Sequence, residues 1–269
     1  MKLCKNALEV LKETSRTFYI PISILPDGLK EAVASAYLCM RAIDEIEDHP
    51  ELDNPTKARL LREISLALQA SGENVNFDCF HDSLNGQSNL LPEVTLRVEE
   101  WAVLAPESIA PRIWDATAAM ADRMAHWAER NWYIETKSDL ETYTFSVAGA
   151  VGLLLSDLWA WYDGTQTNRL HAIGFGRGLQ TVNILRNQKD DLERAVNFFP
   201  QGWSRKDMEQ YARYNLKMAD LYTNSLPAGP AKNFCQIPLA LAHGTIKAMS
   251  LGQEKLTRLD VMQILAKVS

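Results

Sequence analysis

Side chains able to bind a metal ion gather between residues 37 and 48, in the sequence YLCMRAIDEIED. Each residue turns a helix by about 100°, so Tyr37, Arg41, Asp44 and Asp48 fall within an arc of roughly 60°. Two carboxylates four residues apart, with a cation beside them, form one polar stripe on a helix whose other residues are small or apolar. A plainer interpretation is a solvated helix face with an Arg–Asp ion pair.

A second polar stripe lies between residues 180 and 191, in the sequence QTVNILRNQKDD. Its members share an arc of roughly 80° on a helix: Gln180, Asn183, Asn187 and Asp191. Arg186 and Asp190 flank it. Side-chain oxygens over three turns suit hard cations, because Mg²⁺ takes oxygen ligands and is held by few carboxylates plus substrate phosphates. The plainer alternative is a polar surface closed by Lys189 and Arg194.

If the two stripes face each other across a helical bundle, they form a cavity with oxygen ligands at its mouth and apolar walls below. Such a cavity suits a ligand with a diphosphate head and a hydrocarbon tail. Mg²⁺ would bridge carboxylates to phosphate, and the arginines would supply further donors. Stabilising the leaving pyrophosphate would allow an allylic carbocation to form.

Both stripes lie on segments predicted to be helical. A helical face is expected from residue 8 until Pro21 and Pro26 interrupt it. Further helices are expected over 29–48, 57–70, 92–104, 111–132, 138–162, 167–192, 204–224 and 237–251, with short helical pieces and loop over 71–90. Ser204, with Asp207 three residues later, is close to a capping box. No long run of alternating apolar and polar residues predicts a strand. We therefore expect an all-α fold with a single domain over residues 1–269.

Composition narrows the class of protein. Of 269 residues, 46% are hydrophobic and 23% charged, and the net charge is −6, which argues against a nucleic-acid partner because such binding needs a basic face. Four widely spaced cysteines suggest neither a zinc site nor disulfides. The longest apolar stretch, 147–155, is about half of the roughly 20 residues that span a membrane. We expect no signal peptide and no transmembrane segment. A cytoplasmic location is expected, and a peripheral contact with a membrane is left open. The sequence does not indicate the oligomeric state.

Four segments together resemble the squalene/phytoene synthase family: residues 15–18 (SRTF), 37–48, 143–152 (YTFSVAGAVG) and 178–191 (GLQTVNILRNQKDD). Their order and rough spacing match the family from about residue 8 to residue 200. The resemblance implies an all-α isoprenoid-synthase bundle with a central cavity. It also implies Mg²⁺-dependent, head-to-head condensation of two farnesyl or geranylgeranyl diphosphates through a cyclopropyl intermediate. Squalene-type members then use NADPH and phytoene-type members do not; no local signature for NADPH occurs here.

The resemblance also implies roles for individual residues. Catalytic roles are expected for Tyr143, Asp44, Asp48, Asn183 and Asp191. Substrate contacts are expected from Arg16, Phe18, Tyr37, Arg41, Val147, Ala148, Gln180 and Arg186. Mg²⁺ ligands are expected among Asp44, Asp48, Asn183, Asn187 and Asp191. Tyr143 would lie near the carbocation, with Val147 and Ala148 shaping the cavity wall.

The segment 143–152 carries several small residues: Ala148, Gly149, Ala150 and Gly152. We expect them to leave volume for a substrate chain that Leu or Phe would fill. The alternative is close packing of one helix on another through small residues.

One position departs from the family pattern. The second family motif is D-x-x-x-D, whereas Asn187 stands at its first position and only Asp191 keeps a carboxylate. The spacing of Asn183, Asn187 and Asp191 also resembles the metal triad of terpene synthases that act on one substrate. The leading hypothesis is a two-substrate prenyltransferase. The second hypothesis is a divergent member that ionises one prenyl diphosphate. Such a member would act as a terpene synthase, a phosphatase or a transferase to another acceptor. A non-catalytic isoprenoid-binding or partner subunit is the third.

Overall fold

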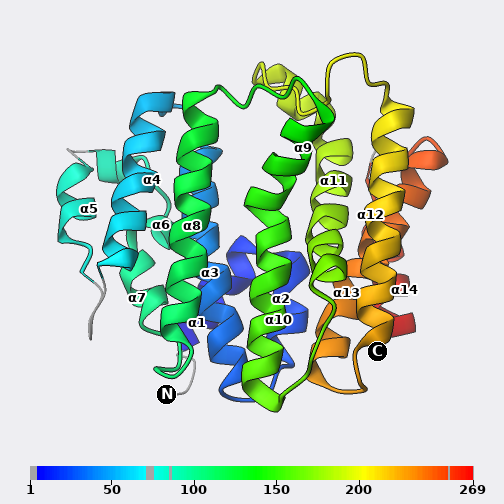
Figure 1. The fold of residues 1–269 in the computed structure, drawn as a ribbon, viewed down its shortest axis with the longest axis horizontal. Helices are drawn as coiled ribbons and strands as arrows, with labels where there is room; N and C mark the ends of the chain where they lie inside the picture. The colour runs from blue at the N-terminus through cyan, green and yellow to red at the C-terminus, as the bar shows by residue number, and fades with distance from the viewer. Residues whose placement is uncertain (1–4, 71–75, 85–86, 254, 269) are drawn as a thin grey trace. The chain divides into compact units, whose positions relative to one another are not determined.

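A computed structural model describes residues 5–70, 76–84, 87–253 and 255–268 (Figure 1). Every regular element within these ranges is helical, so the prediction of an all-α fold is confirmed. Contacts divide the chain into two compact units, residues 1–131 and 132–269, and each is described by itself. The expected single domain and central cavity stay predictions.

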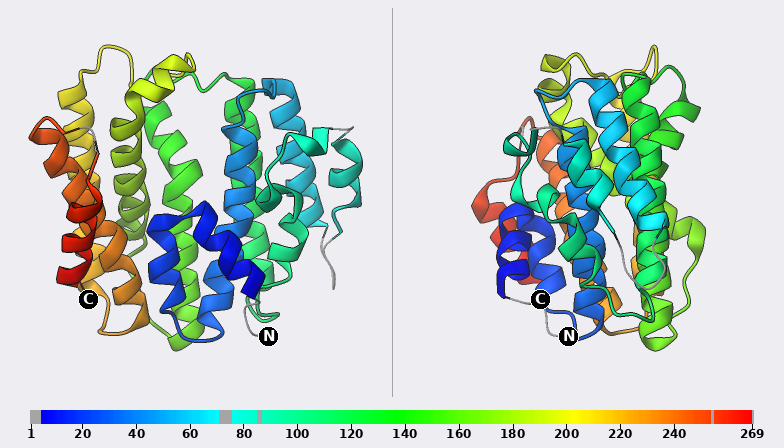
Figure 2. Two further views of the ribbon diagram at one scale, coloured as in Figure 1. Left: turned by 180° about the vertical axis from the view of Figure 1, so that it is seen from behind. Right: turned by 90° about the vertical axis from the view of Figure 1, so that its left-hand side faces the viewer.

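The N-terminal unit packs its helices around one core. Its elements are α1 (Lys5–Thr14), α2 (Arg16–Ser23), α3 (Leu29–Glu47), α4 (Asn54–Gln69), α5 (Asp78–Ser83), the 3₁₀ turn η1 (Gln87–Asn89), α6 (Glu93–Leu96), α7 (Val98–Ala102) and α8 (Ala110–Glu129). Helix α4 runs beside α8, and the two stay adjacent in the views of Figure 2. Trp101 and Trp127 fill the interior. The Ser35 hydroxyl donates to the Trp101 carbonyl at 2.7 Å, which ties α3 to α7.

In the C-terminal unit the long helix α11 is central. The elements are α9 (Lys137–Thr144), the π-helix η2 (Phe145–Gly149), α10 (Ala150–Asp163), α11 (Arg169–Glu193), α12 (Arg205–Ser225), α13 (Pro230–Ser250) and α14 (Arg258–Val268). Helices α10, α12 and α13 all pack on α11. The hydroxyl of Tyr222 lies in the core, where it accepts from Trp159 Nε1 at 3.0 Å and bonds the Ser156 hydroxyl at 3.0 Å.

Most predicted helices occur close to their expected limits, including the capping box of Ser204 and Asp207. The single helix expected over 92–104 is wrong: Arg97 has φ −107° and ψ 22°, outside the α region, and separates α6 from α7. The last long helix begins at Pro230, because proline is favoured at a first helical position, and α14 follows it unforeseen. Part of the irregular 71–90 segment lies outside the described residues.

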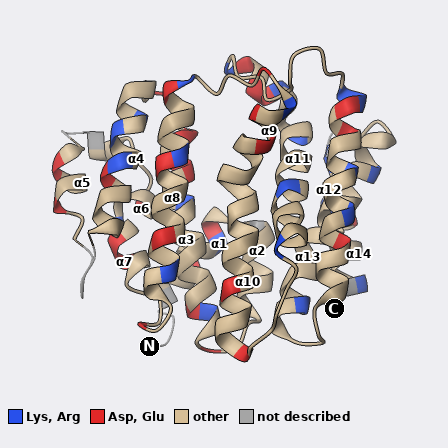
Figure 3. Ribbon diagram, viewed as in Figure 1, with Lys and Arg blue, Asp and Glu red and all other residues tan. Residues whose placement is uncertain are grey.

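Residues 137–163 form one continuous helical run through α9, η2 and α10. The run is long and apolar enough to span a membrane by length and composition alone, and half of its most apolar stretch is buried inside the protein. In Figure 3 helix α10 is mostly uncharged, with Asp157 and Asp163 as its only charged residues. Packing of α10 and η2 against α11 accounts for the buried half of this apolar run.

Glycines in this run serve close packing. A Cβ at Gly152 would lie 2.0 Å from the Ala172 carbonyl oxygen on α11, and one at Gly176 would lie 2.0 Å from the Ala148 carbonyl oxygen. A Cβ at Gly149 would meet side-chain atoms of Phe145 and Ile173 at 3.1 and 3.2 Å. The expectation that Gly149 and Gly152 leave room for a substrate chain is therefore wrong, and the packing alternative holds for both.

We predict that Gly152→Ala destabilises the protein by about 2–3 kcal/mol, because the added methyl group meets a backbone oxygen that cannot move without separating α10 from α11. The measurement is the free energy of unfolding in urea. Gly149→Ala is the matched control, since its neighbours are side chains that can shift and alanine favours helix by about 1 kcal/mol. Equal free energies of unfolding for the two variants would contradict the close packing of Gly152 on the backbone of α11.

Candidate active site on α3 and α11

Helix α3 presents the first predicted stripe. The helix begins after Gly28, whose φ of 84° favours glycine, and the Glu31 carboxylate accepts from the Gly28 N–H at 2.5 Å. Leu38 and Ile43 are fully buried on the opposite side. The apolar side thus anchors α3 in the core and leaves the stripe to project from it.

Asp44 is the electrostatic centre of this stripe. Burial raises the pKa of Asp44 to about 7; Arg41 opposes the rise, and the negative charges of Asp48 and Glu45 add to it. The Asp44 side chain is half-buried, with 36% of its surface accessible. A carboxylate in this position is short of positive charge and still reachable by a ligand.

Arg41 supplies the one guanidinium among these acids. Its NH1 lies 3.8 Å from Asp44 Oδ2, and its NH2 donates to Glu45 Oε1. Its Nε is buried and has no hydrogen-bond partner. Desolvation lowers the pKa of Arg41, but Asp44 and Glu45 outweigh it and the net pKa is raised. Arg41 therefore stays charged and keeps one donor for a ligand oxygen.

Glu45 was missed as a site residue, although its spacing from Arg41 is the i, i+4 spacing of helical ion pairs. It competes for the guanidinium that would otherwise neutralise Asp44. The stripe consequently carries three carboxylates, Asp44, Glu45 and Asp48, against one arginine.

The first family-like segment docks on this stripe. Ser15 caps α2 by accepting from the Phe18 N–H at 2.9 Å, and the Phe18 ring lies 5.8 Å from the Tyr37 ring. The Tyr37 hydroxyl donates to the Thr14 carbonyl at 3.4 Å, and burial raises the pKa of Tyr37. The structure thus brings Phe18 and Tyr37 together. Arg16 begins α2, but its side chain lies outside the described part of the structure.

The α3 stripe fits a divalent cation. Its carboxylates repel one another, and an orphaned guanidinium donor lies beside them. In the described part of the chain, no three acidic, histidine or cysteine side chains gather closely enough to form a complete metal site. Two carboxylates suffice for Mg²⁺ where substrate phosphates complete its shell, so Asp44 and Asp48 are the residues that would hold it.

Helix α11 presents the second stripe with different partners. The side-chain oxygen of Asn183 accepts from Arg186 NH2 and, at 3.3 Å, from the Asn187 amide. The Asn187 oxygen accepts from Arg186 Nε at 3.1 Å. Gln180 lies half-buried one turn before Asn183. The structure brings Asn183, Arg186 and Asn187 into one hydrogen-bonded group.

Asp191 ends the α11 stripe and is buried. Its Oδ1 accepts from Arg194 NH2 at 2.8 Å, and its carbonyl receives the N–H groups of Arg194 and Val196 as the chain leaves the helix. Ala195 has a φ of 59°, a left-handed conformation that turns the chain at this point.

The turn after α11 packs on Tyr143. The rings of Tyr143 and Phe198 stack with centroids 4.7 Å apart, and the Gln201 N–H donates to the Glu135 carbonyl at 2.8 Å. Val147 and Ala148 are half-buried in the π-helix η2, one turn beyond Tyr143. Phe198 was not predicted as a site residue; the aromatic pair in the sequence RAVNFFP was the available signal.

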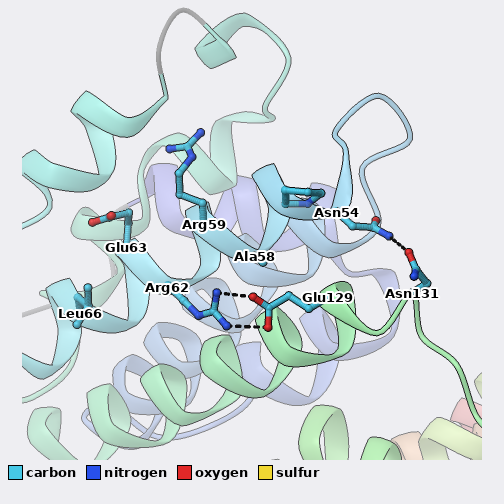
Figure 4. A pocket seen from close by; sticks show the side chains of 9 residues that line it. Asn54, Ala58, Arg59, Arg62, Glu63, Leu66, Glu129 and Asn131 are labelled. Atoms are coloured by element: carbon cyan, nitrogen blue, oxygen red, sulfur yellow. Dashed lines mark hydrogen bonds and ion pairs between the residues drawn. The ribbon is translucent and has the colours of Figure 1, made fainter.

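A hollow of about 580 Å³ lies elsewhere, on α4 and α8 (Figure 4). Arg62 and Glu129 meet across it in two hydrogen bonds of 2.6 and 2.8 Å, and Leu66 lies at its edge. Its charges neutralise each other and none of the predicted site residues lines it. Its chemistry is therefore that of a surface ion pair.

Comparison with known proteins decides the family. A sequence model described as squalene/phytoene synthase matches residues 11–215, which covers all four family-like segments. The chain belongs to the squalene/phytoene synthase family. The resemblance recognised from the sequence motifs is confirmed.

Members of this family named squalene synthase align over most of the chain. The protein of Schizosaccharomyces pombe is 29% identical across 91% of this chain and 59% of its own length. The human protein is 27% identical across 93% of this chain and 64% of its own length. The chain thus spans about three fifths of the length of these relatives.

Solved squalene/phytoene synthase structures share the fold. A complex of TcSQS with the ligand E5700 aligns with a TM-score of 0.79 at 23% identity, covering 97% of this chain and 84% of that one. A dehydrosqualene synthase in complex with a ligand aligns with a TM-score of 0.61 at 17% identity, covering 98% and 94%.

The raised pKa of Asp44 predicts a pH-dependent stability. An unfolded aspartate titrates near pH 4, so between about pH 4 and 7 the folded protein binds one more proton and its free energy of unfolding falls as pH rises. With metal ions removed by EDTA, Asp44→Asn should remove this fall in the free energy of unfolding. Because a third of the side chain is exposed, we expect the variant to exceed the wild type at pH 8 by only about 1 kcal/mol.

The measurement is urea unfolding at pH 5 and pH 8 in EDTA. Asp122→Asn, at an exposed position on α8, is the control and should follow the wild type. Parallel pH profiles for wild type and Asp44→Asn would show that Asp44 is not perturbed.

Proposed function

We propose that this protein condenses two prenyl diphosphates of farnesyl or geranylgeranyl size head-to-head and releases pyrophosphate. The observation that carries the proposal is the α3 stripe, where the guanidinium of Arg41 pairs with Asp44 and Glu45 while the charge of Asp48 acts on Asp44. Such a group binds a metal–diphosphate head and would have little use in a helix face exposed to water alone. The squalene synthases that match most of the chain support the same activity.

In this proposal the α3 residues bind and orient the diphosphate of the ionising substrate. Arg41, whose side chain is 29% accessible, supplies guanidinium donors, and Tyr37 closes the stripe next to it. Mg²⁺ held by Asp44 and Asp48 would neutralise the negative charge that builds on the departing pyrophosphate. Loss of pyrophosphate with the electron pair of its C–O bond leaves an allylic cation on the prenyl chain.

Tyr143 would lie beside this cation. Its ring stacks on Phe198 and is held there, and an aromatic face stabilises a cation within about 6 Å. Val147 and Ala148 would form part of the apolar wall along the chain. The side chains of Val147, Ala148 and Phe198 offer no competing nucleophile to the cation.

A second candidate function is ionisation of one prenyl diphosphate, which is then quenched by water, cyclised or transferred to another acceptor. The observation that favours it is the pair of neutral amides, Asn183 and Asn187, where two carboxylates would serve a second diphosphate through metal. Both functions begin with the same bond cleavage.

We place the protein in the cytoplasm. The described cysteines, Cys39, Cys79 and Cys235, are free thiols, and burial raises the pKa of Cys39 to about 12. Thiols of this kind persist in a reducing compartment. A peripheral membrane contact would give access to prenyl substrates with long apolar tails.

The deciding experiment incubates the protein with Mg²⁺ and labelled farnesyl or geranylgeranyl diphosphate, with and without NADPH. A doubled-length hydrocarbon or its cyclopropyl diphosphate supports condensation, and its dependence on NADPH separates squalene-type from phytoene-type chemistry. Alcohols or hydrocarbons of unchanged length support the one-substrate function. No pyrophosphate release from any prenyl diphosphate would leave a non-catalytic isoprenoid-binding or partner protein.

We predict that Asp44→Ala lowers pyrophosphate release at least 100-fold, because a metal carboxylate is worth several kcal/mol of charge stabilisation. The assay is coupled pyrophosphate detection with saturating Mg²⁺. Asp122→Ala makes the same chemical change on an exposed face of α8 and should keep wild-type turnover. Undiminished turnover in Asp44→Ala would refute the metal role of α3.

A further inference from the structure

The oxygens of the α11 stripe are already engaged by a guanidinium. Arg186 donates from Nε to the Asn187 oxygen at 3.1 Å and from NH2 to the Asn183 oxygen. The Asn187 amide adds a bond of 3.3 Å to the same Asn183 oxygen. One arginine therefore uses both amides as acceptors, and the two amides fix the plane of its guanidinium.

This arrangement does not fit a divalent cation. A metal bound through either amide oxygen would lie within a few ångströms of the Arg186 charge, and the amides bring no negative charge to offset that repulsion. The buried carboxylate of the stripe, Asp191, accepts from Arg194 at 2.8 Å. Mg²⁺ sheds its water reluctantly and needs better ligands than these.

The arrangement does fit an anion. A guanidinium has five N–H donors; two bond the amides, which leaves three for a ligand. Desolvation lowers the pKa of Arg186 and Asp190 opposes that effect, but an arginine remains protonated at neutral pH. Because amides accept hydrogen bonds without neutralising the donor, Arg186 is oriented while keeping its full charge.

Helix α3 provides the contrast. There Arg41 pairs with Asp44 and Glu45, and Asp48 adds a third negative charge next to Asp44, so the stripe has an excess of negative charge. On α11 the hydrogen-bond partners of Arg186 are neutral amides, and Asp190 is the charged group that acts on it. Similar patterns of polar residues at helical spacing thus surround the two arginines with different numbers of carboxylates.

We propose that the α11 stripe is a metal-free diphosphate subsite, in which Asn183 and Asn187 orient Arg186 to bind phosphate oxygens directly. Metal binding then belongs to the α3 stripe alone. Asn187 is a positioning residue in this subsite, and a carboxylate in its place would neutralise Arg186. The inference rests on the proposed function, since it names how a diphosphate is held on one of the two helices.

The first test measures binding of inorganic pyrophosphate in EDTA by calorimetry, with the full chain. The wild type should bind, and Arg186→Gln should weaken binding at least tenfold, the effect of losing one charge-assisted hydrogen bond. Asn187→Asp should also weaken it several-fold. Arg213→Gln, an exposed arginine on the neighbouring helix α12, controls for the change in net charge and should bind like the wild type.

The second test counts Mn²⁺ ions bound in the presence of pyrophosphate, by electron paramagnetic resonance. Asn187→Ala should leave the count unchanged, Asp44→Ala should lower it, and Asn187→Asp should raise it by one. A lower count in Asn187→Ala would overturn the proposal. So would absence of metal-free pyrophosphate binding by the wild type, or equal affinity in Arg186→Gln.

Neither measurement contains a prenyl substrate or involves turnover. If the proposed function fails, prenyl diphosphates release no pyrophosphate while the Arg186-dependent binding persists. If the inference fails, turnover persists while metal-free binding does not depend on Arg186. An unchanged urea midpoint for Arg186→Gln, whose side chain is exposed, confirms that a loss of binding is not a loss of fold.

Discussion

The proposed site depends on keeping three carboxylates of one helix near one another while a single guanidinium pairs with two of them. A negative charge on the half-buried Asp44 is unfavourable, as its raised pKa indicates. Packing on the opposite side of α3 offsets this cost. There Ser35 bonds the Trp101 carbonyl, Thr95 bonds the Ala42 carbonyl, and Leu38 and Ile43 are fully buried. A ligand that brings positive charge to the stripe relieves the repulsion, so the same feature that costs stability favours binding.

The C-terminal unit has a geometric constraint instead. Gly152 and Gly176 let η2 and α10 approach the backbone of α11, and Arg177 of α11 donates to the Glu141 carbonyl at 2.8 Å on the other side of the π-helix. These contacts fix where Tyr143 and Val147 lie relative to α11. π-Helical turns are rare and often occur at functional sites; here the turn re-aims the residues between Tyr143 and Gly149. Gly149 and Gly152 thus set the packing of this segment, and any space for substrate comes from other residues.

Much of this was predictable from the sequence, because helical periodicity and capping are local. Residue spacing predicts the limits of α3 and α11 and the cap at Ser204. It also predicts the association of Tyr37 with Arg41 and Asp44. Residue spacing does not predict the break at Arg97, the π-helix or the role of Gly152. These features depend on contacts with residues that are distant in the sequence. Phe198 was missed for the same reason: nothing near it in the sequence indicates that its ring stacks on Tyr143. The predicted meeting of the two stripes is a still longer-range property and stays a prediction.

The two stripes show why residue spacing alone does not assign a metal site. Both present oxygen atoms at i, i+3 and i+4 intervals with an arginine between them, yet the arginine has opposite consequences. On α3 it is outnumbered by carboxylates and leaves a net negative field, whereas on α11 it is held by amides that cannot cancel its charge. Asn187 differs from aspartate by one atom and one charge, and beside the exposed Arg186 that charge changes how much of the arginine's positive charge remains for a ligand. An enzyme that holds one diphosphate through metal and another through a guanidinium would treat its two sites unequally, and unequal sites allow one substrate to ionise while the other waits intact.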